Sequence, residues 1–206
     1  LADWAATCGE RLDPRRYIAA HEIRDPLPIH LAWAEEGASR TTLAEAFAAA
    51  IVRARHRVRL CSPYFLPPTL ILDALRLAVS CGVRVEAMIP AGSDSRIADL
   101  AADSYVEDLL AAGVELYRYD KGFLHAKVLI VDDRTVSIGT ANMDYRSLLD
   151  NLEATAFIRD RAVARRMAAT FDADLRSCMR IEPQTWRPPL WRRTLGDLLR
   201  FASPLL

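Results

Sequence analysis

The sequence lacks most of the features that mark secreted, membrane-spanning or metal-clustered chains. Its 206 residues hold four cysteines and no Cys-x-x-Cys pair. We interpret these cysteines as small apolar core residues of a reducing compartment. No apolar run approaches the roughly 20 residues that a spanning helix needs, and residues 1–16 lack the apolar stretch of a signal peptide. We therefore expect a chain that is soluble or peripheral to a membrane.

An excess of charge of either sign is also missing. Lys plus Arg and Asp plus Glu both number 27, which gives a formal net charge of +0. A dedicated nucleic-acid-binding protein usually carries a basic excess, so this balance argues against one while allowing a local basic pocket. Apolar residues make up 51% and charged residues 26% of the chain, which is typical of a globular core. The first residue is leucine, so we expect further sequence upstream.

Helical and strand patterns alternate along most of the chain. Residues 1–39 are interrupted by prolines and are interpreted as a connecting segment with one or two short elements. Apolar spacing predicts helices over 41–56, 69–82, 95–113 and 161–178, and strands over 57–62, 83–90, 114–120, 124–133, 135–141 and 152–160. This order predicts an α/β fold with a mixed, largely parallel β-sheet flanked by helices on both faces.

The segment 124–133 carries charged groups on an otherwise apolar strand pattern. His125 and Lys127 are two residues apart, so on a strand they project from the same face. A buried charge without a partner is costly, which favours either a satisfied structural pair or an active site. Asp132 ends the apolar run, and a turn at Asp133-Arg134 leads into the next strand.

The full spacing resembles the signature of the phospholipase D superfamily, H-x-K-x4-D followed after six residues by G-[S/T]-x-N. The matching residues are His125, Lys127, Asp132, Gly139, Thr140 and Asn142. Threonine stands at position 140 where serine is more usual, and the hydroxyl is kept. The match falls on a strand–turn–strand pattern, which makes a chance agreement improbable.

Longer stretches resemble one branch of that superfamily, the bacterial cardiolipin synthases. They cover most of residues 57–206, at 61–68, 82–95, 104–133, 139–160 and 186–206. Enzymes of that branch hold two such catalytic halves in one chain, and this sequence resembles the second half. The resemblance implies the end of a preceding half-domain and a connector over 1–39, a phospholipase D-like catalytic domain over 40–182, and an amphipathic tail over 183–206.

The resemblance also implies a reaction. A phosphatidyl group passes from one phosphatidylglycerol to another through a phosphohistidine intermediate, without a metal or other cofactor. His125 is then the nucleophile or the general acid and base. Lys127 stabilises the developing phosphorane, Asn142 and Thr140 hydrogen-bond its oxygens, and Glu153 holds the second ring nitrogen of the histidine.

Four further residues belong to the predicted site. Asp132 is carried over as part of the catalytic motif, and we interpret it as fixing the local turn. Tyr64, Phe65 and Gly139 are predicted to bind substrate. The two aromatic residues suit a lipid-side pocket and suit equally well the role of core residues that anchor a loop.

One half cannot perform this reaction alone, and no second H-x-K is found at His21, His30 or His56. The other half must come from an absent N-terminal region or from a second copy of the chain. We expect a phospholipid substrate, a membrane surface and that second half as partners, and no nucleic acid.

The tail carries Trp186, Trp191 and several arginines beside an apolar set, which suits a bilayer interface or a helix packed on the domain. The expected location is the cytoplasmic side of the bacterial inner membrane, peripheral or anchored by a missing region. Two alternatives stay open, a phospholipase D or nuclease with water as acceptor and a non-catalytic lipid-binding or dimerisation module. A degenerate, inactive half is a further rival.

Overall fold

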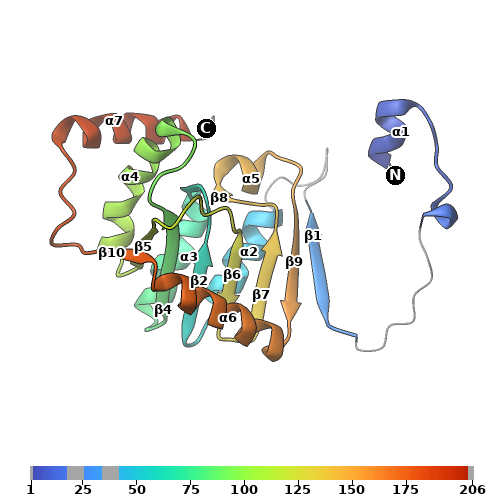
Figure 1. Cartoon of the computed structure of the whole chain (residues 1–206), viewed down its shortest axis with the longest axis horizontal. Helices are drawn as coiled ribbons and strands as arrows, with labels where there is room; N and C mark the ends of the chain where they lie inside the picture. Colours follow the sequence, from blue (N-terminus) through green and yellow to red (C-terminus); the bar gives the residue numbers. More distant parts are fainter. Residues whose placement is uncertain (1, 18–25, 34–41, 204–206) are drawn as a thin grey trace.

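The protein is built around one large sheet with helices on both faces (Figure 1). The computed structural model describes residues 2–17, 26–33 and 42–203. The strands of the large sheet are β1 (Ile29–Trp33), β2 (Arg57–Cys61), β4 (Arg84–Pro90), β5 (Glu115–Tyr119), β6 (Val128–Val131), β7 (Thr135–Gly139), β9 (Ala154–Arg159) and β10 (Cys178–Ile181). Their spatial order is β1-β9-β7-β6-β2-β4-β5-β10, and the short strands β3 (Phe65–Leu66) and β8 (Met143–Asp144) form a separate pair.

The helices lie before, between and after these strands along the chain. They are α1 (Ala2–Cys8), α2 (Thr42–Val52), α3 (Thr69–Ser80), α4 (Arg96–Ala111), α5 (Tyr145–Leu149), α6 (Arg161–Leu175) and α7 (Leu190–Phe201), with a 3₁₀ turn at Pro14–Arg16. Each long helix from α2 to α6 coincides with one predicted from the sequence. No helix in the described part of the chain is long and apolar enough to cross a membrane.

The sheet is mixed, as predicted, but it is not largely parallel. Only β2 with β4 and β4 with β5 run parallel, and the other five neighbouring pairs are antiparallel. The parallel pairs are those joined by the crossover helices α3 and α4. Strands β6 and β7 are joined by a turn of three residues, which is long enough only for an antiparallel hairpin.

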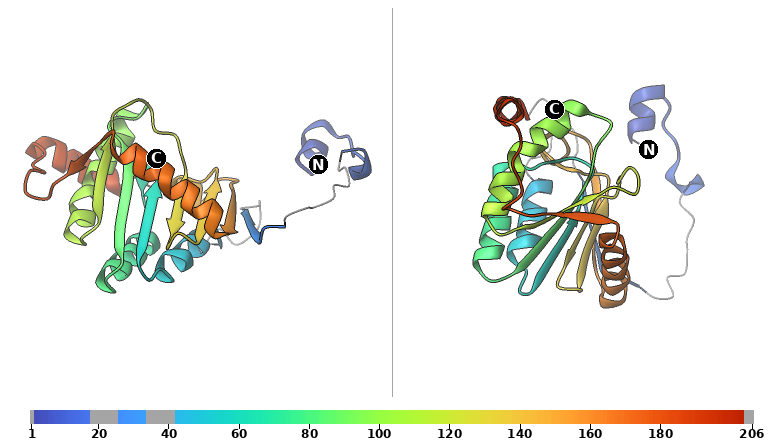
Figure 2. Two further views of the ribbon diagram at one scale, coloured as in Figure 1. Left: turned by 60° about the horizontal axis from the view of Figure 1, so that its bottom comes forward. Right: turned by 60° about the vertical axis from the view of Figure 1, so that its left-hand side comes forward.

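Alternation along the strands builds a core on each face of the sheet. On β2, Val58 and Leu60 belong to the larger cluster, which includes buried residues of α2, α3 and α4. Cys61 belongs to the smaller cluster, together with Phe171 of α6. Figure 2 shows α6 lying across one face of the sheet while α2 and α3 cover the other. The structure therefore has three layers, a sheet between two sets of helices, and apolar residues are buried on both faces of the sheet.

Several details differ from the sequence predictions. Strands β1 and β10 were not predicted, and β1 falls within the range interpreted as connector but pairs with β9. The N-terminal part of the predicted strand 124–133 has no regular secondary structure, since β6 begins at Val128. The cysteine interpretation was wrong for Cys8 and Cys81, which are exposed.

One end of the sheet is braced by Ser62, which follows β2. Its backbone N–H donates to the Met88 carbonyl at 3.3 Å. Its hydroxyl donates to the Tyr64 carbonyl at 2.6 Å and accepts from the Met143 N–H at 2.9 Å. These bonds tie the segment after β2 to the segment after β7. They bring β3, β8 and α5 together at this end of the sheet (Figure 1).

Candidate active site

His125 and Lys127 lie together in the extended segment that enters β6. The Lys127 ammonium lies 3.2 Å from His125 Nε2 and donates to the His125 backbone carbonyl at 3.1 Å. An ammonium has three donors and no acceptor, so this contact is a hydrogen bond when Nε2 carries the lone pair and Nδ1 carries the proton. The two side chains share one side, as their spacing predicts, and His125 is open to solvent.

Charges around Lys127 favour its ionised form. Burial lowers the pKa of Lys127 below its ordinary value, whereas the nearby carboxylates of Glu153 and Asp144 act to raise it. Because the burial effect is larger, the pKa remains lowered overall. The ammonium therefore lies in a half-buried position between a histidine nitrogen and two carboxylates.

Thr140 and Glu153 form a second part of the site. The Thr140 hydroxyl donates to the Glu153 carboxylate and accepts from the Ala154 N–H at 3.0 Å. The Thr140 N–H also donates to the Ala154 carbonyl at 3.0 Å. The carboxylate predicted to hold the His125 ring thus binds the threonine hydroxyl and lies close enough to influence Lys127.

Asn142 is anchored by a carboxylate that the sequence prediction missed. Asp144 is buried and caps α5 by accepting from the Ser147 N–H at 2.7 Å. Burial raises the pKa of Asp144, while the Ser147 N–H and the Asn142 amide oppose that rise. With the amide nitrogen bound there, Asn142 Oδ1 is buried and has no partner among the described residues. The sequence signal was an aspartate three residues before Ser147, the spacing of a helix cap.

A polar cavity of about 310 Å³ adjoins this group. Its lining includes Tyr64, Ser95, Asn142, Asp144, Arg146 and Asn151. The Tyr64 hydroxyl donates to Asp94, and this bond raises the pKa of Tyr64 to about 12. Phe65 is only 4% exposed and packs in the larger core. Of the two aromatic residues considered for the pocket, Tyr64 lines this cavity and Phe65 anchors the loop.

Gly139 contributes to the site through its lack of a side chain. A Cβ at this position would lie 2.4 Å from the Ala154 carbonyl oxygen and 2.6 Å from Thr155 Cα. Glycine therefore allows β7 and β9 to approach closely where Gly139 pairs with Thr155. This contact sets the position of Thr140, which follows directly.

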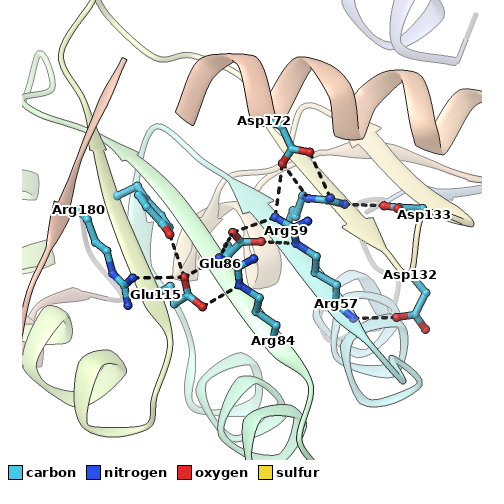
Figure 3. A network of polar contacts seen from close by, with 10 residues as sticks. Arg57, Arg59, Arg84, Glu86, Glu115, Asp132, Asp133, Asp172 and Arg180 are labelled. Carbon is cyan, nitrogen blue, oxygen red and sulfur yellow. Dashed lines mark hydrogen bonds and ion pairs between the residues drawn. The ribbon is translucent and has the colours of Figure 1, made fainter. Parts of the chain in front are cut away.

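Asp132 is not part of the group around Lys127. It lies at the far end of β6, where its carboxylate accepts the backbone N–H groups of Arg55, His56 and Arg57 at 2.8–2.9 Å (Figure 3). Burial alone raises the pKa of Asp132, but the three donors hold it below its ordinary value. The residue fixes the chain between α2 and β2, in keeping with the structural interpretation of its role.

A network of charges lies near Asp132, on the face of the sheet that α6 covers. Glu86 is 0% exposed and accepts from Arg57 Nε at 2.5 Å and Arg57 Nη2 at 3.0 Å. Arg84 Nη2 lies 3.0 Å from the same carboxylate and also pairs with Glu115. Arg59, Asp133, Asp172 and Arg180 extend this network (Figure 3). It joins β2, β4, β5, β10 and α6.

No group of three or more His, Cys, Asp or Glu side chains suited to a metal ion occurs in residues 2–17, 26–33 and 42–203. The chemical groups gathered at the sheet end are an imidazole whose Nε2 lies beside an ammonium, a hydroxyl and an amide. Such a set provides a nucleophile and hydrogen-bond donors for an anionic oxygen.

Comparison with known proteins finds the same family at two levels. A family described as cardiolipin synthase, PLD-like domain, matches residues 47–175. The major cardiolipin synthase of Bacillus subtilis is 41% identical over 157 residues, which cover 76% of this chain and 33% of that protein. Cardiolipin synthase 2 of Bacillus anthracis is 36% identical over 209 residues, covering 100% of this chain and 41% of that protein.

Among solved structures, the phospholipase D family member Nuc from Salmonella typhimurium is similar in fold. The TM-score is 0.65 at 21% sequence identity, and the match covers 76% of this chain and 99% of that one. This chain therefore spans a third to two-fifths of the two curated relatives, and nearly all of a smaller chain of the same fold.

Proposed function

The chain belongs to the family of cardiolipin synthase PLD-like domains, as its motifs predict, and we propose that it is one of two catalytic halves of a phosphatidyltransferase. The reaction moves a phosphatidyl group from one phosphatidylglycerol to the terminal hydroxyl of another and releases glycerol. The observation that carries the proposal is the contact between Lys127 Nζ and His125 Nε2. It places a cation beside the lone pair that would attack phosphorus.

In the first step, the lone pair of His125 Nε2 forms a bond to phosphorus as the bond between phosphorus and the oxygen of the headgroup glycerol breaks. The Lys127 ammonium turns from the ring nitrogen to the phosphoryl oxygens and neutralises their charge. The leaving alkoxide takes a proton from an acid outside this motif, which we assign to the histidine of the other half. In the second step, that same histidine accepts the proton of the incoming hydroxyl. The hydroxyl oxygen then forms a bond to phosphorus and displaces His125 Nε2.

The other groups hold the phosphoryl oxygens and the pair itself. Glu153 accepts the hydroxyl proton of Thr140 and also acts on the charge of Lys127, so this carboxylate links the threonine to the cation. Asn142 is held by Asp144 at the edge of the 310 Å³ cavity. We assign this cavity to the polar headgroup. If His125 has the opposite role, of acid and base, the same lone pair on Nε2 accepts the proton.

The second half is proposed to come from the longer protein or from a second copy, because only one such motif is present in this sequence. We place the enzyme at the cytoplasmic side of a bacterial inner membrane, where phosphatidylglycerol is available. Fractionation of cells expressing a tagged longer protein tests this placement. Recovery in a membrane-free fraction that retains the activity would contradict it.

The test of function uses phosphatidylglycerol vesicles and the complete two-half protein. We expect cardiolipin and glycerol as products by mass spectrometry, and loss of at least about 10³-fold in turnover for His125→Asn. His30→Asn on the exposed strand β1 is the matched control and should retain activity. Release of phosphatidic acid without cardiolipin would identify water as the acceptor, and cleavage of DNA alone would overturn the lipid substrate.

A further inference from the structure

The charged and apolar faces of helix α7 are arranged in the reverse of the pattern that an ordinary surface helix has. Surface helices normally turn an apolar stripe toward the core and a charged face toward water. In α7 a charged face lies against α4, and five of the large apolar side chains are exposed, while Leu199 packs against the larger core. The right-hand view of Figure 2 shows α7 nearly end on, outside α4 and away from the sheet.

Ion pairs and one glycine hold the inward face of α7. Arg192 Nε lies 2.5 Å from Asp103, Arg193 Nη2 lies 3.0 Å from Glu107, and Arg200 Nη1 lies 2.7 Å from Asp108. A Cβ at Gly196 would lie 2.8 Å from the Leu100 carbonyl oxygen, so the two backbones are in close contact. Asp103 is buried and also binds Arg118 at 2.7 Å.

The outward face carries an apolar stripe that contains one polar residue, Thr194. Leu190 is 81%, Trp191 63%, Leu198 62% and Phe201 87% exposed, and Leu195 adds to the same side at 38%. The spacings of 4, 3 and 8 residues between these positions place them along one side of the helix. The contacts of α7 with α4 keep this stripe out of the core, since rotating the helix would break all three ion pairs.

The position of α7 relates it to the active site. A cavity of about 440 Å³ is lined by Tyr145 of α5 together with Arg200 and Phe201 of α7. Tyr145 follows Asp144, the carboxylate that holds Asn142. Helix α7 thus lies at the same end of the sheet as β8 and α5 (Figure 1), so a surface that receives the stripe would face the mouth of the site.

We propose that α7 is a docking helix that inserts its apolar stripe into the interface of an anionic phospholipid bilayer. The stripe belongs to one 12-residue helix, whereas a stable protein interface needs about 800 Å² and 20–30 residues on each side. Trp191 suits the headgroup boundary, and Arg187, exposed just before the helix, supplies a positive charge that complements lipid phosphates. The proposal gives the proposed lipid substrate a route into the site, but it does not depend on transfer activity.

Vesicle co-sedimentation of the 206-residue chain tests the proposal. The lipids are phosphatidylcholine alone and phosphatidylcholine with phosphatidylglycerol. The test variant combines Trp191→Ser, Leu198→Ser and Phe201→Ser, and the control combines Leu70→Ser and Leu77→Ser, two residues of α3 that are 45% and 49% exposed. We expect the test variant to bind phosphatidylglycerol vesicles at least about 10-fold more weakly than the wild type, and the control to bind normally.

A second measurement tests the insertion of α7 into the bilayer with a single substitution. Brominated lipid should quench part of the wild-type tryptophan fluorescence, and Trp191→Leu should remove that quenched part while binding persists. Equal binding by the wild type and the test variant, or no difference in quenching, overturns the proposal. So does a lipid-free dimer in sedimentation velocity that the test variant dissociates, because the stripe would then be covered by a second copy. Loss of transferase activity alone does not bear on this result, since binding is the readout.

Discussion

The Lys127 ammonium contacts His125 twice, at the ring nitrogen Nε2 at 3.2 Å and at the backbone carbonyl at 3.1 Å. The second contact holds the lysine side chain over its neighbour even when the first is given up to a phosphoryl oxygen. We propose that the ammonium shields the histidine lone pair in the free protein and moves to the substrate anion when it binds. Substitutions in the site, in its supporting strands and in the charge network around Glu86 should therefore change activity or stability in different ways.

Replacement of Lys127 by glutamine should lower turnover by about 10²–10³-fold with little effect on folding, because a transition-state cation is lost. Lys121→Gln, on an exposed residue of the same connection, is the control. Since burial lowers the pKa of Lys127, turnover should fall on the alkaline side at a pH below the ordinary lysine value of about 10.4. A fall only above that value would contradict the role given to this ammonium.

Thr140→Ser should keep most of the activity, and Thr140→Val should lose about 10-fold or more. Serine retains the hydroxyl that donates to Glu153, whereas valine leaves that carboxylate without this donor. Steady-state kinetics on both variants separates the hydroxyl from the methyl group. Equal activity of the two would show that Thr140 does not take part.

Gly139→Ala should destabilise the fold by about 1–3 kcal/mol, because the added methyl group meets the backbone of Ala154 and Thr155. Gly92→Ala is a fair control, since its Cβ would meet only Asp99 Oδ2 at 4.0 Å. Urea denaturation measures both changes. An unfolding midpoint for Gly139→Ala equal to that of the control would refute the close approach of β7 and β9.

Asp132→Asn should lower the free energy of unfolding by about 1–3 kcal/mol at neutral pH, since a charged acceptor of three N–H groups is lost. The pKa of Asp132 is lower in the folded protein than in the unfolded chain. The stability it contributes is therefore complete above the unfolded value of about 3.9 and is lost as the pH falls through the folded value. The wild type and variant should converge in acid, and a difference that grows on acidification would be inconsistent with this.

Glu86→Gln should lower the free energy of unfolding by about 1–3 kcal/mol, because the buried acceptor of Arg57 and Arg84 loses its charge while both arginines keep partial exposure and a second acidic partner. Asp73→Asn breaks an exposed pair with Arg76 and should cost at most about 1 kcal/mol. Thermal and denaturant unfolding compare them. Similar losses for the two variants would mean that the network around Glu86 contributes little.

The sequence predicted the elements and motif well because both depend on local spacing. The long helices follow from apolar periodicity, and the shared side of His125 and Lys127 follows from an extended backbone. Contacts between residues far apart in the sequence could not be predicted in this way. Asp132 binds N–H groups 75–77 residues away, and Glu153 binds Thr140 across two strands. No local pattern contains these contacts.

The prediction of a largely parallel sheet was wrong for a related reason. Alternating helices and strands predict parallel pairing, which holds for β2, β4 and β5. The later strands follow one another through short connections, and β1 and β10 enter the sheet from outside the periodic region. Their four or five residues give a weak sequence signal, since their outer faces are exposed.

Strand β1 has a practical consequence for anyone who trims the chain. A fragment beginning at residue 40, the start of the motif-bearing region, would discard the five residues that pair with β9. The amide and carbonyl groups on the edge of β9 that faces away from β7 would then be unpaired, which favours strand exchange between molecules and precipitation. A fragment that starts upstream of Ile29 keeps that border closed and is the safer choice for expression.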